Sequence, residues 1–155
     1  MSTLSRAHVR AIEYHLPERV ETGAQVAGQF PDWHVAKIEQ RTGIFGRHIA
    51  APDECASDLA VRAAERLFAS GVVTPAEIDF LLFCTETPDY LVPPTACVLQ
   101  HRLSLPRTAG DGEPSLGPFV FGTGVGGRRL RPGALVALLG FGAGYSWAAT
   151  LLRWK

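Results

Sequence analysis

The first part of the chain alternates between apolar and polar positions in short runs that are broken by proline. Residues 7–14 (AHVRAIEY) predict a strand that ends at Leu16-Pro17. Residues 24–40 favour helix in pieces around Pro31, because a proline ends or kinks a helix. Residues 47–50 favour a short extended segment. We therefore expect a strand, a broken helical region and a second extended piece before residue 51.

The clearest helical period lies in residues 57–70, where leucine and alanine recur on one apolar face. Ser57 is the candidate N-cap of this helix, and Gly71 is its candidate stop. Residues 74–77 (TPAE) match a capping box with proline at the first helical position. A long helix followed by a second helix start is therefore predicted.

Apolar runs in the second half of the chain complete the pattern. Residues 78–84 (IDFLLFC) follow a helix, which is typical of a buried strand in a parallel, helix-covered sheet. Residues 95–103 predict another helix, whereas residues 106–132 are rich in Gly, Pro and Arg. The runs LVALLG and SWAATLL, at 135–140 and 146–152, predict a final strand pair joined by a glycine turn. This order of elements indicates an α/β fold.

The last apolar region has a second interpretation. Residues 134–152 contain no charged residue and are flanked by Arg131 and Arg153, so their length matches a membrane span. Glycines at positions 140, 142 and 144 interrupt the middle of the run. We expect the strand pair rather than a bilayer crossing, and a small membrane-attached protein is kept as an alternative.

Composition adds limits on the class of protein. The 155 residues are 46% apolar and 19% charged, which is enough apolar material for one domain with a core. Fifteen basic residues balance fifteen acidic ones, so no net charge points to nucleic acid, although no acidic residue follows Glu113. The three cysteines show no zinc-ligand spacing, and the N-terminus lacks the apolar segment of a secretory signal. We expect a cytoplasmic protein without a metal site.

Four groups of short motifs follow one another along the chain. They are RTGI at 41–44 with RHIA at 47–50; TETPDY at 85–90 with PPTA at 93–96; QHRL at 100–103; and GFGAG at 140–144 with SW at 146–147 and RW at 153–154. Together they resemble the ketoacyl-acyl-carrier-protein synthase III family. The resemblance covers residues 7–121 and 130–155, and it implies a partial thiolase-like fold made of the N-terminal half and the closing C-terminal strand pair.

The resemblance implies a reaction as well as a fold. Enzymes of this family begin fatty-acid or polyketide chains, and their cysteine takes an acyl group from coenzyme A. The acyl-enzyme then condenses with malonyl-acyl-carrier protein and loses carbon dioxide, while a His and an Asn stabilise the carbanion. The family therefore uses acyl-coenzyme A as a substrate and acyl-carrier protein as a partner, and it needs no separate cofactor.

The nucleophile of the family has no counterpart in this sequence. Counting from Leu103, the Cys-Ser-Gly-Phe-like motif falls on Pro118. Proline has neither a thiol nor a backbone N–H, so it removes the nucleophile and one oxyanion-hole donor together. After Gly127 the chain passes almost directly to the closing strands, so the positions of the family His and Asn are missing too. We therefore expect a truncated or internally deleted member without catalytic residues.

Some peripheral positions of the family site have counterparts. Arg41 matches a residue that holds the coenzyme A nucleotide, and a plain surface arginine is the alternative. Gly142, Ala143 and Gly144 match the turn whose backbone N–H completes an oxyanion hole, but the family has glycine where Ala143 stands. We expect this remnant to act only as a turn. Trp33 lies too far before Arg41 to match the adenine-stacking tryptophan, so we expect it to pack in the core.

Other residues that could take part in catalysis or binding give weaker indications of function. Cys84 in a predicted strand and Cys97 in a predicted helix are expected to pack, and Cys55, just before a helix, is the least unsuitable substitute nucleophile. Residues 122–127 match GxGxxG, but no acidic residue follows them, so a dinucleotide site is not expected. The arginines within residues 128–131 could meet an acidic carrier protein, although a solvated loop is the favoured reading.

The resemblance also divides the chain. Residues 1–122 form an N-terminal thiolase-like segment, residues 123–132 a Gly/Arg-rich junction, and residues 133–155 the closing strand pair. In the family these strands pair with both halves of a duplicated fold, so we expect them to lack neighbours here and to leave edges that invite dimerisation. The hypothesis kept beside an inactive synthase is a binding or dimerisation module for a full-length homologue or an acyl-carrier protein.

Overall fold

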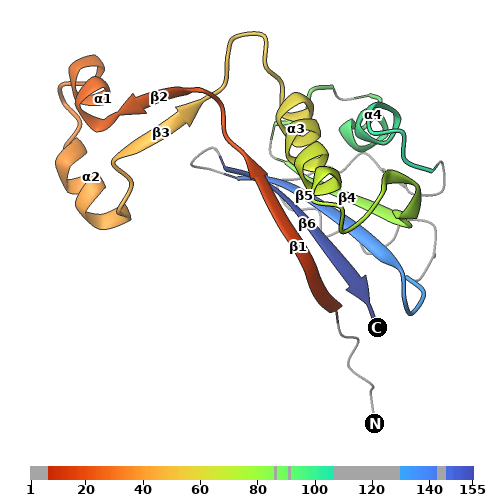
Figure 1. Cartoon of the computed structure of the whole chain (residues 1–155). Coiled ribbons are helices and arrows are strands. Elements are labelled where there is room, and N and C mark those ends of the chain that lie inside the picture. The colour runs from red at the N-terminus through yellow and green to blue at the C-terminus, as the bar shows by residue number, and fades with distance from the viewer. Residues whose placement is uncertain (1–6, 86, 91, 107–129, 143–145) are drawn as a thin grey trace.

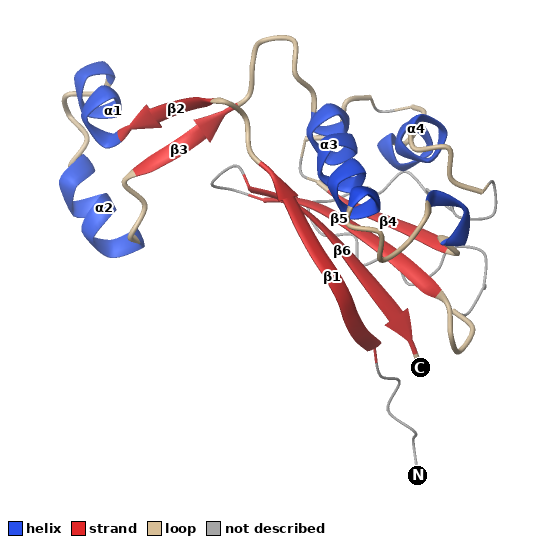
Figure 2. Cartoon of the chain, in the orientation of Figure 1, coloured by secondary structure: helices blue, strands red, loops and turns tan. Residues whose placement is uncertain are grey.

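The computed structural model describes residues 7–85, 87–90, 92–106, 130–142 and 146–155. Within these ranges the chain forms a four-stranded mixed sheet with helices on one face, and a separate two-stranded ribbon with two helices of its own (Figures 1 and 2). The α/β class expected from the sequence is confirmed.

The large sheet is closed by the C-terminal strand pair. Its order is β1 (Ala7–His15), β6 (Ser146–Trp154), β5 (Leu135–Gly142) and β4 (Phe80–Cys84). Strands β4 and β5 are parallel, whereas β6 is antiparallel to both β5 and β1. The prediction of a parallel sheet therefore holds only for the β4–β5 pair, and the strands expected at 7–14, 78–84, 135–140 and 146–152 are all present with shifted ends.

The closing strands do not lack neighbours, and this corrects the expectation from the sequence. Strand β5 pairs with β4 on one side, and β6 pairs with β1 on the other, so the hairpin fills the centre of the sheet. Asp79, just before β4, fixes the register because its backbone N–H donates to the carbonyl of Leu135 at 2.9 Å. Its carboxylate accepts the Leu135 N–H at 2.8 Å. The edge strands among the described residues are β1 and β4.

Residues 134–152 thus lie largely in two strands rather than in one continuous segment. No helix within the described ranges is long and apolar enough to cross a membrane.

Helices α3 (Ala56–Ala69) and α4 (Thr95–Arg102) pack on one face of the sheet and against each other (Figure 1). The helix predicted at 57–70 begins one residue earlier, and its N-cap is Cys55 rather than Ser57. The Asp58 carboxylate accepts the Cys55 N–H at 2.8 Å, so an acid in the first turn does the capping instead. Gly71, with φ of 74°, follows the helix end as expected.

The core lies between α3, α4 and the sheet. The apolar residues spaced along α3 meet the alternate residues of β5 and β6 that point to the same face. The largest fully buried side chains there are Leu59, Leu67, Ile78, Leu99, Leu139 and Leu151. The capping box expected at 74–77 is present and opens a short 3-10 turn, Pro75–Glu77, that leads into β4.

The second unit, which we call the outer lobe, spans residues 19–49. It contains β2 (Arg19–Thr22), α1 (Gly23–Gln29), α2 (Val35–Thr42) and β3 (Gly46–Ile49), and β2 and β3 form an antiparallel ribbon. The broken helical region and the extended piece are confirmed, whereas β2 was not expected. Arg41 and Thr42 complete α2, two residues beyond the predicted helical region, and Gly43 then ends the helix with φ of 71°.

Candidate functional site

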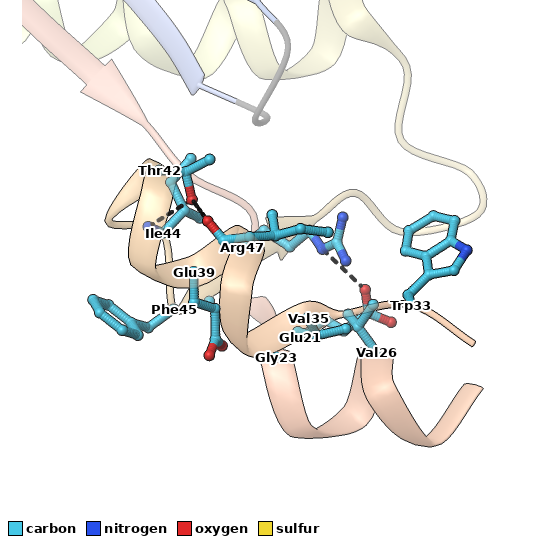
Figure 3. A pocket seen from close by; sticks show the side chains of 12 residues that line it. Glu21, Gly23, Val26, Trp33, Val35, Glu39, Thr42, Ile44, Phe45 and Arg47 are labelled. Atoms are coloured by element: carbon cyan, nitrogen blue, oxygen red, sulfur yellow. Dashed lines mark hydrogen bonds and ion pairs between the residues drawn. The ribbon is translucent and has the colours of Figure 1, made fainter. Parts of the chain in front are cut away.

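A cavity of about 200 Å³ opens in the outer lobe, between the ribbon and the two helices (Figure 3). Its walls combine an apolar floor from the helices with charged groups from the ribbon and from α2. The residues that line it are Glu21, Gly23, Val26, Trp33, Val35, Ile38, Glu39, Thr42, Ile44, Phe45, Gly46 and Arg47. A concave site with few charged groups in an apolar wall is typical of small-molecule binding.

Trp33 lies at the rim of this cavity rather than in the core, which corrects the expectation from the sequence (Figure 3). Its side chain is 52% exposed. One face of the indole stacks on Phe30, with ring centroids 4.6 Å apart and planes 20° apart. The Pro31-Asp32 break between α1 and α2 places both rings on the lobe surface. The apolar character of the two residues does not by itself predict this position.

Charges at the cavity are partly neutralised by an ion pair. Arg47 Nε lies 3.2 Å from a carboxylate oxygen of Glu21, across the β2–β3 ribbon. Partly exposed pairs of this kind contribute about 0–1 kcal/mol to stability. The pair therefore orients two side chains at the cavity more than it stabilises the lobe.

Arg41 occupies the last turn of α2 and is exposed. It is not among the residues that line the cavity, although its neighbour Thr42 is. Within the described part of the chain its guanidinium makes no hydrogen bond or ion pair. Its contact with a coenzyme A nucleotide stays a prediction.

The other predicted site positions fall at the limits of the described residues. Gly142 is the last residue of β5 and pairs with Ser146, the first residue of β6. Ala143 and Gly144 lie outside the described residues, and so does Pro118. Strand β6 therefore begins at residue 146, where the sequence placed it. Strand β5 runs two residues beyond its predicted end at residue 140, so Gly142 belongs to the strand rather than to the turn.

The histidines of the resembling segments are separated. His48 lies in β3, and its Nδ1 contacts the carbonyl oxygen of Pro17. His101 is exposed in the last turn of α4. No group of three His, Cys, Asp or Glu side chains in the described ranges could hold a metal ion.

The cysteines lie apart from the cavity. Cys84 ends β4 and Cys97 lies in α4, as predicted, and both are half-buried. Cys55 is exposed at the start of α3, a position that favours a thiolate. Partial desolvation nevertheless raises the pKa of its thiol, and the carboxylates of Asp89 and Asp58 raise it further, against the opposing charge of Arg102. The acidic surroundings make Cys55 a poor nucleophile.

Cys55 is therefore expected to react slowly. In the folded chain its alkylation by iodoacetamide at pH 8 should be slower than in urea, followed at this peptide by mass spectrometry. Asp89→Asn should accelerate the folded-state reaction, because it removes a negative charge and keeps an oxygen for the Ser57 N–H that Asp89 now accepts at 3.2 Å. Faster alkylation in the folded chain than in urea would contradict this reading.

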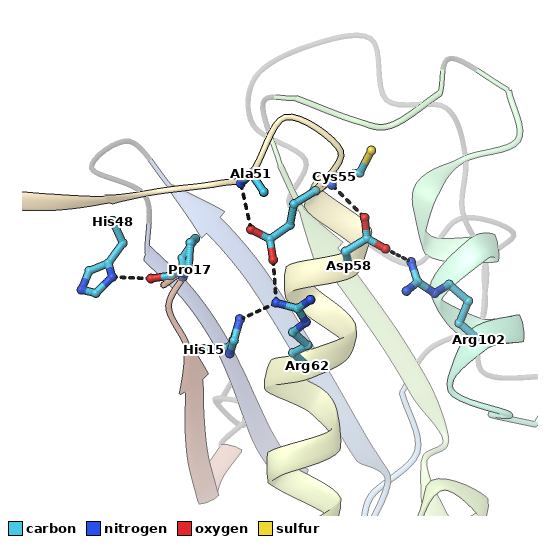
Figure 4. A network of polar contacts seen from close by, with 9 residues as sticks. His15, Pro17, His48, Ala51, Cys55, Asp58, Arg62 and Arg102 are labelled. Atoms are coloured by element: carbon cyan, nitrogen blue, oxygen red, sulfur yellow. Dashed lines mark hydrogen bonds and ion pairs between the residues drawn. The ribbon is translucent and has the colours of Figure 1, made fainter. Parts of the chain in front are cut away.

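A line of polar contacts connects the start of α3 with its surroundings (Figure 4). Arg102 from α4 donates to the Asp58 carboxylate at 2.7 Å and to the Ser57 hydroxyl at 2.9 Å. Burial raises the pKa of Asp58, but the hydrogen bonds from the Cys55 N–H and from Arg102 outweigh it and hold that pKa below its ordinary value. These contacts join the start of α3 to the last turn of α4.

Comparison with known proteins gives a consistent result. Residues 118–154 match the model for the 3-oxoacyl-[acyl-carrier-protein] synthase III C terminal. The chain is 37% identical over 132 residues to a beta-ketoacyl-[acyl-carrier-protein] synthase III of Thioalkalivibrio sulfidiphilus, covering 83% of this chain and 40% of that protein. It is 38% identical over 142 residues to the Bradyrhizobium diazoefficiens protein of the same name, covering 91% and 43%.

Solved structures agree with the sequences. A crystal structure of a 3-oxoacyl-(acyl-carrier-protein) synthase III superposes with a TM-score of 0.71 at 32% identity, over 96% of this chain and 50% of that one. The corresponding synthase of Pseudomonas aeruginosa gives a TM-score of 0.68 at 28% identity, over 95% and 51%. The fold is therefore partial thiolase-like, and the chain spans about 40% of the length of the curated relatives that it matches.

Proposed function

This chain belongs to the 3-oxoacyl-[acyl-carrier-protein] synthase III family as a member of partial length, and from this premise we propose that it does not catalyse the family condensation by itself. The proposal rests on the count from Leu103, which puts Pro118 where the resemblance places the nucleophile. The match to the C-terminal family model begins at this same residue. Sequence typical of the C-terminal part of the family therefore stands where the nucleophile is expected.

The described cysteines do not substitute for the missing thiol. Cys84 and Cys97 are half-buried in a strand and a helix. Cys55 is exposed, but partial desolvation and acidic neighbours raise the pKa of its thiol. A thiol that stays protonated near neutral pH attacks a thioester slowly. The family reaction, acyl transfer from acyl-coenzyme A followed by condensation with malonyl-acyl-carrier protein, is thus proposed only as the ancestry of this chain.

Intact-protein mass spectrometry tests this proposal. After incubation with acetyl-coenzyme A and with longer acyl-coenzyme A thioesters, the mass of the chain is expected to stay unchanged. A full-length synthase of the family, treated in parallel, provides the positive control for acyl transfer. A stable acyl adduct on one cysteine of this chain would overturn the proposal, and loss of that adduct in Cys55→Ala would identify the nucleophile.

A binding module is the second candidate, and the outer lobe favours it. The lobe keeps a formed cavity with Trp33 at its rim and with Arg41 exposed nearby. We propose that Arg41 contacts the phosphates of a coenzyme A nucleotide, which a guanidinium binds with paired donors. Calorimetric titration with coenzyme A should show weaker binding for Arg41→Ala than for the unmodified chain, and equal affinities would refute the assignment.

A protein partner is consistent with the edge strand β1. Val9, Ile12 and Tyr14 are all more than half exposed and belong to the sheet face opposite α3. We propose that a full-length homologue or an acyl-carrier protein is a candidate partner, and that a homodimer is the simplest assembly. Size-exclusion chromatography with light scattering, for the chain alone and in mixture, separates these states from a monomer.

A further inference from the structure

The outer lobe is attached to the sheet through two chain crossings. Residues 16–18 leave β1 for the lobe, and residues 50–55 return from it to α3 (Figure 1). Among the described elements, substantial packing lies either within the lobe or between the sheet and its helices, and none of it joins the two units. Contacts at the crossings therefore bear directly on how the lobe is oriented.

One guanidinium holds the two crossings together (Figure 4). Arg62, on the exposed side of α3, donates through Nη1 to Glu54 Oε1 at 2.6 Å. The same nitrogen lies 3.3 Å from Nε2 of His15, the last residue of β1. The other oxygen of Glu54 accepts the backbone N–H of Ala51 at 3.2 Å. Arg62 thus links His15, where the outgoing crossing starts, to Glu54 in the returning crossing, and through Glu54 to Ala51.

The contact between Arg62 and His15 requires one protonation state. A guanidinium has only donors, so Nε2 of His15 must be the acceptor and the ring must be neutral, with its proton on Nδ1. His15 is 8% exposed. Adding a proton on Nε2 to give the imidazolium would place two donors and two positive charges against each other beside a nearly buried ring.

The charges around His15 come from every neighbouring element. Burial lowers its pKa below the ordinary value, and the positive charges of Arg62 and Arg66 on α3 lower it further. Glu54 in the returning crossing and Glu18 in the outgoing one oppose this shift. His48, in β3, ties the lobe to the outgoing crossing separately, because its Nδ1 contacts the carbonyl oxygen of Pro17.

We propose that His15, Arg62 and Glu54 form a pH-sensitive latch that fixes the orientation of the outer lobe relative to the sheet. With His15 neutral, the latch is closed and the lobe is held. With His15 protonated, Arg62 turns away from the ring, and the returning crossing loses its tie to β1. The latch regulates how the lobe cavity is presented, and it does not depend on the function proposed for that cavity.

The direction of the effect follows from the lowered pKa. A base whose pKa is lower in the closed state than when free favours the closed state fully above its free value, about 6.5. Below about pH 6.5 the open state binds more protons, so closure weakens as the pH falls. The latch is therefore closed at pH 7.5 and is lost toward acid pH.

Residual dipolar couplings of backbone amides measure the orientation directly. At pH 7.5 one alignment tensor should fit the couplings of both the lobe and the sheet. At a pH below the midpoint of the His15 ring titration, the lobe should require a separate tensor of smaller magnitude, and the Ala51 amide shift should change with the same midpoint. His15→Gln keeps an acceptor oxygen without a titrating proton, so it should retain one tensor at both pH values.

His8→Gln is the matched control, because His8 is an exposed histidine on the same strand. This variant should behave like the unmodified chain. A single tensor for the unmodified chain at both pH values would overturn the proposal, and so would a loss of common alignment in His15→Gln at acid pH. If His15→Gln does not fold, Glu54→Gln provides the second test, because a weaker tie should separate the tensors already at pH 7.5.

Discussion

Replacing Leu139 by alanine is expected to lower the free energy of unfolding by about 2–5 kcal/mol, the usual cost of a leucine-sized cavity in a core. Leu139 lies in the middle of β5, is 1% exposed and belongs to the cluster between α3 and the sheet. Strand β5 has neighbours on both sides, which limits how far the backbone can move to fill the cavity. Urea titration followed by circular dichroism measures the loss.

The adjacent residue provides the control for this substitution. Leu138 points to the opposite face of the same strand and is only half-buried. Leu138→Ala removes the same atoms from a less enclosed site, so it should cost clearly less than Leu139→Ala. Equal losses for the two variants would show that the face covered by α3 is not the principal core.

Local pattern was sufficient to predict the elements that bury a regular face. The apolar period of α3 and the uncharged runs of residues 134–152 are strong because one side of each element packs in the core. The local pattern does not predict strand β2, because this strand buries no regular face. Its four residues are mostly exposed, and they form a strand only by pairing with β3, more than twenty positions further along the chain.

Errors at the ends of elements have identifiable causes. Serine is a common N-cap residue, but the backbone N–H of Ser57 donates to Asp89 and its hydroxyl accepts from Arg102. These tertiary contacts place Ser57 inside the first turn, and the Asp58 carboxylate caps the helix at Cys55. The sequence contains both candidates, and only the position of α4 decides between them.

The candidate site divides in a similar way. Pro118 and Arg41 were identified because the resemblance supplies a fixed spacing to count from. No local pattern predicts the latch at Arg62, because its partners His15 and Glu54 lie 47 and 8 positions away along the chain. The sequence predicts Trp33 in the core, since nothing local distinguishes a buried tryptophan from one at a cavity rim.

The prediction that the closing strands lack neighbours is also wrong. The expectation that β5 and β6 would be unpaired treated their partners as specific to the duplicated fold. Strands β4 and β1 instead offer parallel and antiparallel edges with apolar residues in matching register. Hydrogen-bonding edges are generic, so an available edge with a complementary face is sufficient.

A chain that ends at Gly142 is accordingly expected to lose its cooperative unfolding transition. The missing strand β6 supplies all the sheet partners of β1 within the described residues, and one of the two partners of β5. Its Ala149 and Leu151 are almost completely buried against the core. Without β6 the strand β1 is unpaired, and α3 loses part of the apolar surface that holds it on the sheet.

The structural consequence is larger than that of any single core substitution, because a whole central strand leaves the sheet and two edges are exposed inside the core. Circular dichroism should show a gradual change with temperature in place of a sigmoidal transition, and amide signals in the NMR spectrum should lose their dispersion. Removal of Lys155 alone is the control, since it is exposed and lies beyond β6, and it should leave the transition in place. A cooperative transition in the chain that ends at Gly142 would mean that β1, β4, β5 and the helices form a core without β6, and that the sheet order given above does not determine stability.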